Sequence, residues 1–406
     1  MKKRLLFVTQ YLHTGGAEKS LLTLLGELDY GRYDVDLLLF DHSGALFPLV
    51  PKQVNVLPPL FETFTDPLSS AVPKLLKRGR YRLLAGRALA SAAAKFAKGK
   101  GVGVRWSIYR HALPARREAY DAAISYLDFH CNYYVAEKVR ARTKILYNHM
   151  DYGYSEQQGW PCPPLERASF AACDYIVTVA DSAKASLARY FPDYAPKMRV
   201  IHNRVSAETV RAMAGEVLAA FQKPERKSGI TVATVARLGE EKGVRLALEA
   251  CALLVRAGAD VRWYLVGDGL LRGELEAHAR ELGLTERFIL LGELANPYPV
   301  MDGCDIYVQP SLTEAHCIAV EEALALAKPV VVTDIPSFRN QIENGVSGVI
   351  APASAEGLAD AIGRLAADRA RRESLQRQLR QAGGRHPDEL KRFYSLIEGG
   401  DYEKVT

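Results

Sequence analysis

Residues 230–266 have the sequence ITVATVARLGEEKGVRLALEACALLVRAGADVRWYLV. The stretch begins and ends with short apolar runs, residues 230–236 and 261–266, which are typical of buried β-strands. Between them, apolar residues recur at helical spacing and predict a helix over 244–257 with one core-facing stripe, made by Val244, Ala247, Leu248, Cys251 and Val255. A strand, a helix and a second strand in this order predict a parallel β-sheet covered by helices.

The same alternation extends in both directions from this unit. Downstream we expect strands at residues 288–291, 306–309 and 330–333, and helices at 270–282, 318–327 and 355–367. Upstream we expect a helix at 16–29 and strands at 5–9, 35–40, 122–126, 144–148, 176–179 and 198–201. The predicted fold class is α/β, with two doubly wound Rossmann-like domains facing across a cleft, where each sheet would present the carboxyl ends of its strands to ligands.

A polar stretch separates the two halves of the chain. Residues 222–229, QKPERKSG, combine Pro, Gly and charged residues, which is typical of a linker. We therefore expect an N-terminal domain over 1–203, a C-terminal domain over 204–385 with 204–228 as the linker region, and a C-terminal segment over 386–406.

The composition excludes several classes of protein. The chain has 406 residues, 48% apolar and 25% charged, so a largely disordered protein is excluded. No apolar run reaches the ~18–20 residues of a membrane-spanning helix, and the apolar stretch after Met1 to Arg4 is too short for a signal peptide. The six cysteines form no Cys-x-x-Cys pair, which predicts free thiols and no zinc site. We expect a cytoplasmic protein.

The positive charge is concentrated in one block. Residues 67–117 contain thirteen Lys or Arg and no Asp or Glu, and the net charge of +6 would be −7 without them. Leucines and aromatic residues lie between these cations, a mixture that suits the surface of an anionic bilayer. A solvated basic face and a nucleic-acid patch are the alternatives, but no nucleic-acid fold motif accompanies the block. We favour the membrane surface and expect no nucleic-acid partner.

Two loops contain residues suited to binding an anion. Gly15 and Gly16 lie between a predicted strand and a predicted helix, where glycine allows close backbone approach and the first helix amides favour phosphate. A simple tight turn is the alternative there. Arg237 and Lys242 share the loop after the strand at 230–236, so both could converge on one diphosphate. Surface cations beside the two glutamates of that loop are the alternative.

Two glutamates and one histidine complete the candidates. Glu314 precedes a predicted helix and Glu322 lies within it, where a buried carboxylate needs donors such as ribose hydroxyls. The backbone between them could present helix-start amides to a sugar, at Ala315, His316, Cys317 and Ile318. Two solvated glutamates are the alternative. His149 follows a predicted strand and could polarise or position a reacting group, although a lone histidine is more often structural.

Taken together, these stretches resemble the retaining GT-B glycosyltransferases of the group-1 family, glycosyltransferase family four. The likeness covers nearly the whole chain. In the second half it is carried by Arg237…Glu241-Lys242-Gly243, Leu265-Val266-Gly267-Asp268-Gly269, Asn296-Pro297-Tyr298-Pro299 and Glu314-x7-Glu322-Ala323. In the first half, Gly15-Gly16-Ala17-Glu18 matches the family's loop and His149 its active-site histidine. The Asn-Pro-Tyr-Pro stretch and residues 149–152 are similar to members that build capsular or other surface polysaccharides.

The resemblance implies an activity and a role for each matched residue. The protein would be a hexosyltransferase that moves a sugar, with retention, from a nucleotide-sugar to a sugar or lipid-linked acceptor in bacterial capsule or exopolysaccharide synthesis. A UDP-sugar is the family's usual donor. The implied roles are diphosphate binding by Gly15, Gly16, Arg237 and Lys242, ribose binding by Glu322, donor-sugar binding by Ala315, His316, Cys317 and Ile318, and catalysis by His149 and Glu314.

The resemblance also implies how the parts of the chain divide the work. The first domain would bind the acceptor and the second the nucleotide-sugar, and a C-terminal helix over 387–397 would pack back on the first domain. With Arg237 and Lys242 at the diphosphate, no metal ion and no other cofactor would be needed. The basic segment 67–117 would bind the anionic inner face of the plasma membrane.

The sequence departs from the family pattern in the sugar-binding stretch. Ala315 stands where the family usually has Gly, and His316-Cys317 replaces a common aromatic-glycine pair, so the donor sugar stays open. Two other function classes remain as alternatives: a nucleotide-sugar epimerase on a similar two-domain fold, and a non-catalytic nucleotide-sugar-binding protein.

Overall fold

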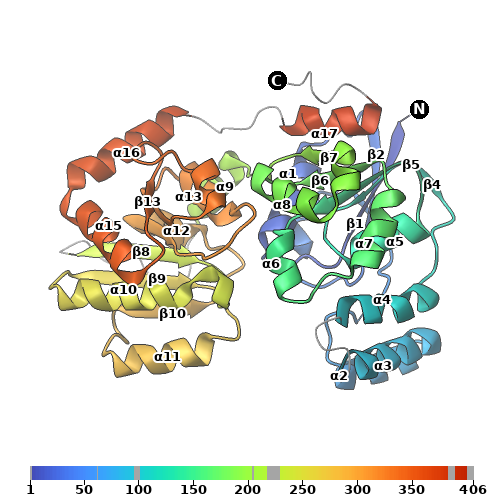
Figure 1. The fold of residues 1–406 in the computed structure, drawn as a ribbon, viewed down its shortest axis with the longest axis horizontal. Coiled ribbons are helices and arrows are strands. Elements are labelled where there is room, and N and C mark those ends of the chain that lie inside the picture. Colours follow the sequence, from blue (N-terminus) through green and yellow to red (C-terminus); the bar gives the residue numbers. More distant parts are fainter. Residues whose placement is uncertain are drawn as a thin grey trace. The chain divides into compact units, whose positions relative to one another are not determined.

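The computed structural model describes residues 2–61, 63–95, 101–203, 205–216, 229–382 and 389–399. The chain divides into two compact units, one of residues 1–204 and 388–406 and one of residues 205–387 (Figure 1). Each unit is built around one parallel β-sheet, as the alternation of apolar runs and helical patterns predicts. Most of the expected linker, 217–228, lies outside the described residues, and residues 205–216 contain helix α9 of the second unit.

The first unit has a seven-stranded parallel sheet in the order β3-β2-β1-β4-β5-β6-β7. Its strands are β1 (Lys3–Thr9), β2 (Tyr33–Leu39), β3 (Asn55–Val56), β4 (Ala119–Ser125), β5 (Arg140–Asn148), β6 (Tyr175–Thr178) and β7 (Met198–Val200). The chain order reverses at β1, where Leu5 pairs with Val35 on one side and Ala122 on the other. The carboxyl ends of β1 and β4 therefore form the edge where such sheets bind ligands.

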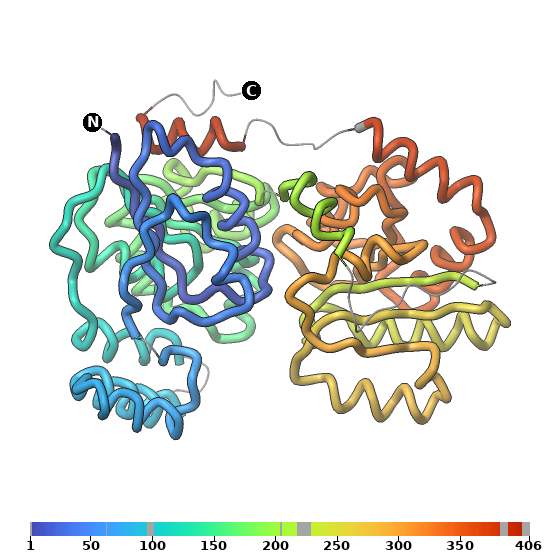
Figure 2. The backbone as a smooth tube through the Cα atoms, turned by 180° about the vertical axis from the view of Figure 1, so that it is seen from behind, coloured from blue at the N-terminus to red at the C-terminus, as the bar shows by residue number. Residues whose placement is uncertain are grey.

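Helices cover this sheet and extend the unit at one end. They are α1 (Gly16–Glu27), α2 (Leu68–Lys77), α3 (Tyr81–Lys95), α4 (Gly101–Ala112), α5 (His130–Lys138), α6 (Tyr152–Gln157), α7 (Pro163–Ala171), α8 (Asp181–Tyr190) and α17 (Glu389–Glu398), with short 3₁₀ turns η1 (Phe47–Leu49) and η2 (Pro192–Lys197). The basic block forms α2, α3 and α4, which lie together at one end of the unit (Figures 1 and 2). No helix of the described chain is both long and apolar enough to cross a bilayer.

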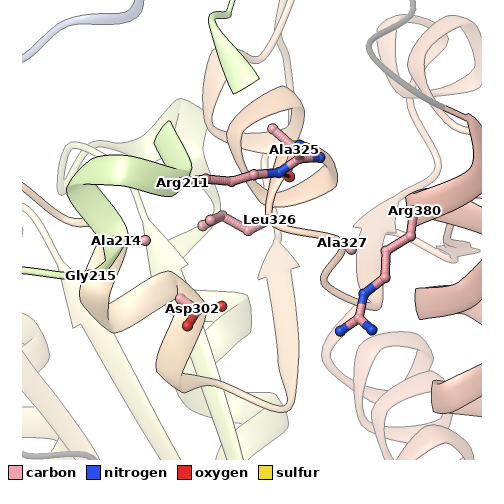
Figure 3. A pocket seen from close by; sticks show the side chains of 8 residues that line it. All are labelled: Arg211, Ala214, Gly215, Asp302, Ala325, Leu326, Ala327 and Arg380. Carbon is pink, nitrogen blue, oxygen red and sulfur yellow. Dashed lines mark hydrogen bonds between the residues drawn. The ribbon is translucent and has the colours of Figure 1, made fainter. Parts of the chain in front are cut away.

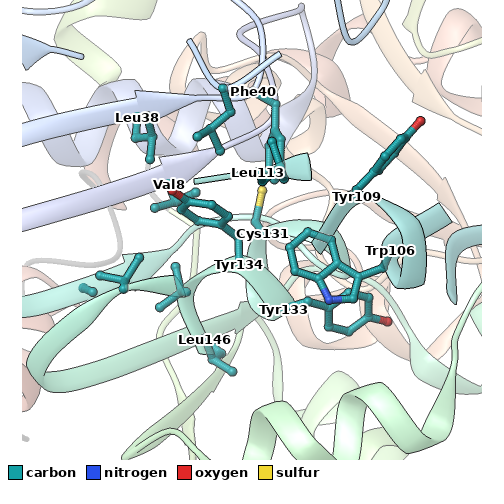
Figure 4. Packing of buried hydrophobic residues seen from close by; sticks show 14 of the residues in the cluster. Val8, Leu38, Phe40, Trp106, Tyr109, Leu113, Cys131, Tyr133, Tyr134 and Leu146 are labelled. Atoms are coloured by element: carbon teal, nitrogen blue, oxygen red, sulfur yellow. The ribbon is translucent and has the colours of Figure 1, made fainter. Parts of the chain in front are cut away.

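Helix α4 joins the basic block to the core of the first unit. Trp106 is fully buried, and its ring lies 5.7 Å from that of Tyr133 on α5 (Figure 4). Its indole N–H donates to Glu137 at 3.1 Å. Burying an aromatic side chain of this size stabilises the folded state by several kcal/mol. The orientation of the block on its unit is therefore fixed by packing.

Helix α17 is part of the first unit although it lies at the far end of the sequence. The ring of Phe393 stacks on that of Phe7 at 5.9 Å, and Glu389 accepts from the ring nitrogen of His202 at 3.0 Å. Tyr394 stacks on Tyr33 at 5.4 Å. These contacts place the C-terminal helix on β1 and β2.

The second unit has a six-stranded parallel sheet in the order β10-β9-β8-β11-β12-β13. Its strands are β8 (Ile230–Val235), β9 (Val261–Val266), β10 (Phe288–Gly292), β11 (Ile306–Gln309), β12 (Val330–Thr333) and β13 (Val349–Ala351). The covering elements are α9 (Ala207–Ala214), η3 (Glu240–Lys242), α10 (Val244–Arg256), α11 (Arg272–Glu281), α12 (Tyr298–Gly303), α13 (Ile318–Ala325), α14 (Pro336–Gln341), α15 (Ala355–Ala367) and α16 (Arg369–Ala382). The order reverses at β8, so the carboxyl ends of β8 and β11 form this unit's ligand edge.

Candidate functional site

The loop after β8 brings Lys242 to Glu314. Gly243 ends the turn η3 with φ 61°, and a Cβ there would lie 1.9 Å from the carbonyl oxygen of Pro310, which follows β11. Only glycine allows this approach. The Lys242 ammonium then donates to Glu314 Oε1 at 2.7 Å. Two of the predicted site residues, 72 positions apart, thus form an ion pair at the carboxyl ends of adjacent strands.

The ion pair is largely withdrawn from solvent. The side chains of Lys242 and Glu314 are 18% and 9% exposed. Burial alone lowers the pKa of Lys242, but the negative charge of Glu314 outweighs it and the net pKa is raised above the ordinary value. Lys242 is therefore a fixed cation at neutral pH, with two ammonium N–H groups beyond the one that Glu314 accepts.

A chain of buried hydrogen bonds positions Glu314 from the strand side. Tyr307 donates to Gln309 at 2.7 Å, Gln309 to the hydroxyl of Ser311 at 2.9 Å, and Ser311 to Glu314 Oε1 at 2.8 Å. All three residues are on β11 or directly after it. A carboxylate with fixed donors keeps one orientation, which precise ligand binding requires.

Arg237 is not brought to the ion pair. Its side chain is 73% exposed and pairs with Glu241, four residues along the same loop, at 3.1 Å. The loop therefore presents one buried cation, Lys242, and one cation in solvent. An exposed ion pair of this kind contributes at most about 1 kcal/mol, so the Arg237 side chain can leave Glu241 and reorient at little cost.

Glu322 lies on the buried side of helix α13. It is 1% exposed, and its Oε1 accepts from the hydroxyl of Tyr298 on α12 at 2.8 Å. Burial raises the pKa of Tyr298 above its ordinary value, and the carboxylate of Glu322 raises it further, so the phenol stays a donor. The alternative of a solvated glutamate is wrong for Glu322.

The turn between the two glutamates is buried as well. Ala315, Cys317 and Ile318 are 8%, 6% and 5% exposed, and the His316 ring lies 3.7 Å from the carboxylate of Glu321. The amide of Cys317 already donates to the side chain of Gln341 at 2.9 Å. Burial raises the pKa of the Cys317 thiol, so it is not a reactive thiolate. All six cysteines are free thiols.

His149 lies just after β5 in the first unit. Its backbone N–H donates to Asp128 Oδ2 at 3.1 Å, and its ring stacks on Tyr147 at 5.6 Å. Neither ring nitrogen has a hydrogen-bond partner among the described residues. Burial lowers the pKa of His149 to about 4 and raises that of Asp128 to about 7. The imidazole is therefore neutral near pH 7.

The Gly15-Gly16 turn is partly occupied by its own helix. Gly15 is the N-cap of α1, and the Glu18 carboxylate lies so close that a Cβ on Gly15 would be 2.2 Å from it. An anion at this helix start would meet that carboxylate. Tyr126 links the helix to His149, since its hydroxyl is 3.1 Å from Ser20 on α1 and its ring 5.2 Å from the imidazole.

The structure adds residues that the sequence interpretation did not assign. Tyr298, Ser311 and Gln341 each hydrogen-bond to a predicted site residue, and Gln309 hydrogen-bonds to Ser311. Tyr298 belongs to the Asn-Pro-Tyr-Pro stretch and Gln309 ends a predicted strand, so the sequence pattern could have indicated both as site residues. No local sequence pattern indicated Gln341, since it lies 24 residues after the backbone that it contacts.

A hollow of about 510 Å³ opens elsewhere in the second unit. It is lined by residues of α9, α12, α13 and α16 and the segments that follow α9 and α13, with Arg211 and Arg380 at opposite sides (Figure 3). Arg211 donates to the carbonyl oxygen of Ala325 at 2.9 Å. None of the predicted site residues lines this hollow, so it is separate from the ion pair of Lys242 and Glu314.

Comparison with known proteins identifies both halves of the chain. Residues 14–209 match the model of Glycosyltransferase Family 4, and residues 218–383 match that of Glycosyl transferases group 1. In fold, Anabaena HepE in complex with UDP-glucose is similar with a TM-score of 0.65 over 98% of this chain and 99% of that chain, at 18% identity.

Curated relatives match over shorter regions. The Alpha-D-kanosaminyltransferase of Streptomyces kanamyceticus is 33% identical over 35% of this chain, and the amylovoran biosynthesis glycosyltransferase AmsK of Erwinia amylovora is 33% identical over 30%. A Campylobacter jejuni N-acetylgalactosaminyltransferase that acts on a diphospho-undecaprenol-linked sugar is 28% identical over 43%. The chain spans 37%, 32% and 45% of these relatives' lengths. With both halves matched, the chain belongs to the group-1 glycosyltransferases of family 4, with the GT-B fold.

Proposed function

We propose that this protein transfers a sugar from a UDP-sugar to a sugar or lipid-linked sugar acceptor, with retention, in the synthesis of a bacterial surface polysaccharide. The observation that carries the proposal is the buried ion pair of Lys242 and Glu314 at the ligand edge of the second sheet. Its support from relatives is the UDP-glucose complex of HepE, the amylovoran pathway of AmsK and the lipid-linked substrate of the Campylobacter enzyme.

In this proposal Lys242 binds the diphosphate of the donor. As the bond from the anomeric carbon to the β-phosphate oxygen breaks, negative charge grows on that oxygen, and a fixed cation in a site shielded from water stabilises it. Arg237 would turn from Glu241 to join it. The acceptor hydroxyl attacks from the side of the departing phosphate, which takes its proton.

The remaining predicted residues would orient the donor. Glu322, positioned by Tyr298, would accept from the ribose hydroxyls. Glu314 and the turn over residues 315–318 would contact the sugar. His149 would meet the reacting groups as a neutral imidazole, because burial lowers its pKa to about 4. We propose that Lys242 and Arg237 replace a divalent metal, so the enzyme would need no cofactor.

The activity test measures UDP release from a panel of UDP-hexoses with and without oligosaccharide and undecaprenyl-diphosphate-linked acceptors. Release that requires both donor and acceptor, with an α-linked product from an α-linked donor, supports the proposal. Conversion of the donor sugar without acceptor would show an epimerase. Tight UDP binding with no release under any condition would show a binding protein. Either of these last two results would overturn the proposal.

We further propose that the surface of α2 and α3 binds the anionic inner face of the plasma membrane, where a lipid-linked acceptor would lie. Leu76, Tyr81 and Leu89 are 46%, 64% and 60% exposed on this surface. Not every cation of the block serves it: Arg87 is buried and donates to Thr63 at 2.8 Å, and Lys74 pairs with Asp66 at 2.8 Å. Exposed Leu and Tyr among Lys and Arg suit a headgroup layer, with about 1 kcal/mol for each cation.

The membrane test is cosedimentation with vesicles of phosphatidylglycerol and phosphatidylethanolamine. A triple variant, Lys77→Glu, Arg78→Glu and Arg82→Glu, should lose most binding. A control variant reverses the same charge at exposed sites of the same unit, at Lys52, Arg140 and Arg189. Equal binding by the two triple variants would show a solvated basic face instead.

A further inference from the structure

Gln341 makes contacts that a surface glutamine does not make. It is the last residue of α14 and is 7% exposed. Its Oε1 accepts from the backbone N–H of Cys317 at 2.9 Å, and its Nε2 donates to the carbonyl oxygen of the same residue at 3.1 Å. The side-chain amide therefore pairs with the Cys317 peptide groups in both directions, as a neighbouring β-strand would.

The Gln341 side chain also contacts one residue before Cys317 and one residue after it. Gln341 Nε2 donates to Glu321 Oε1 at 3.2 Å and lies 3.3 Å from Nε2 of His316. His316 precedes Cys317, and Glu321 is in the first turn of α13. One buried amide thus connects the residue before the helix, the N-cap and the first helical turn.

These contacts determine which backbone groups a ligand can reach. The turn runs from Glu314 to the start of α13, whose N-cap is Cys317. The N–H of an N-cap region is a natural donor to a ligand oxygen, but the N–H of Cys317 is used by Gln341. A sugar at this turn would therefore be bound by Glu314 and by backbone groups on either side of Cys317, in an arrangement that Gln341 fixes.

We propose that Gln341 is a positioning residue for the donor sugar and sets which hexose the enzyme accepts; this rests on the proposed function. Gln341 lies next to the turn and acts through it, so its removal should change the binding of the sugar and leave the binding of UDP, which Lys242 and Glu322 provide. A glutamine that only fills space would instead affect both ligands equally, or neither.

Three variants separate these cases. Gln341→Leu has a similar volume but makes no hydrogen bond, so it tests the pairing with Cys317. Gln341→Glu still accepts from the Cys317 N–H but cannot donate, and its charge faces Glu321. The double variant with Glu321→Gln again has one amide and one carboxylate, in exchanged positions. It should therefore remove the repulsion between the two carboxylates. Asn340→Ala, an exposed neighbour on the same helix, is the matched control.

The experiment compares the Kd of UDP with the KM and kcat for UDP-glucose, UDP-galactose and UDP-N-acetylglucosamine. For Gln341→Leu we expect a UDP Kd within about twofold of wild type, a KM for the preferred donor raised about tenfold, and a reduced ratio of kcat/KM between epimeric donors. Gln341→Glu should be worse and the double variant better, while Asn340→Ala should equal wild type.

Two results would overturn the inference alone: unchanged KM and donor ratios in Gln341→Leu, or equal weakening of UDP and UDP-sugar in a folded variant. A wild-type protein that transfers no sugar would instead overturn the proposed function. Binding measurements on Gln341→Leu would then still decide the role of Gln341. A Kd that rises for UDP-glucose but not for UDP supports this role, and an equal change in the two Kd values refutes it.

Discussion

Replacing Lys242 by Met tests the proposed diphosphate site most directly. The substitution keeps the apolar stem and removes the cation that lies 2.7 Å from Glu314. A hydrogen bond to a charged group contributes about 1.5–3 kcal/mol, and each 1.4 kcal/mol is a factor of ten in affinity. The Kd of UDP should therefore rise about 10- to 150-fold, measured by titration calorimetry.

The same change also costs stability, and the two effects must be separated. Glu314 is 9% exposed and would lose its cation while keeping the hydrogen bond from Ser311. A buried carboxylate that loses a partner destabilises the fold by about 1–3 kcal/mol. The double variant Lys242→Met, Glu314→Gln removes both charges, so its free energy of unfolding should return toward wild type while its UDP affinity stays low.

The reasoning has a clear refutation. If Lys242→Met unfolds near the wild-type temperature and binds UDP as tightly as wild type, Lys242 does not bind the diphosphate. If the double variant regains UDP affinity together with stability, the loss in the single variant was a folding defect. Glu241→Gln, which changes the partner of the exposed Arg237, serves as control and should leave the free energy of unfolding within about 0.5 kcal/mol of wild type.

Three further predictions rest on single residues. Gly243→Ala places a methyl group against Pro310 at a φ of 61°, so the free energy of unfolding should fall by more than about 2 kcal/mol in denaturant titration. Tyr298→Phe removes the hydroxyl that orients Glu322, so the preference for UDP over 2′-deoxy-UDP should narrow; an unchanged ratio would argue against ribose binding by Glu322. Burial raises the pKa of Asp128 to about 7, so the native state retains a proton that the unfolded state loses, and this stabilisation disappears as the pH rises from about 4 to 7. The free energy of unfolding of Asp128→Asn should thus rise relative to that of wild type as the pH increases through that window, by up to about 1.4 kcal/mol per pH unit; equal pH slopes in the two proteins would refute the shift.

The fold could be predicted because its signals are local. The apolar run of β8 and the helical stripe of α10 are each contained within fifteen residues, and their alternation is enough to predict a parallel sheet. The edge strands β3 and β13 have two and three residues and are too short to stand out. The basic helices α2 to α4 were not predicted as helices because their apolar residues are spread among cations.

The site could be predicted only as far as topology fixes it. Lys242 and Glu314 follow β8 and β11, which are adjacent in the sheet, so their proximity follows from strand order. The direction of the Arg237 side chain does not, since a long side chain on an exposed loop selects its partner by rotamer. Glu18 had a local signal that was missed: a glutamate at the third helical position commonly folds back on the N-cap, here Gly15.

The ion pair also explains how a buried lysine can stay charged when no ligand is bound. A lone ammonium there would be costly to desolvate and would tend to lose its proton. Glu314 offsets that cost and raises the pKa of Lys242, while it accepts only one of three ammonium hydrogens. In the proposed function the other two would donate to phosphate oxygens, so a donor would add a second anion to a cation that is already in place. Binding then requires little rearrangement of Lys242, which is the condition under which electrostatic stabilisation of a leaving group is most effective.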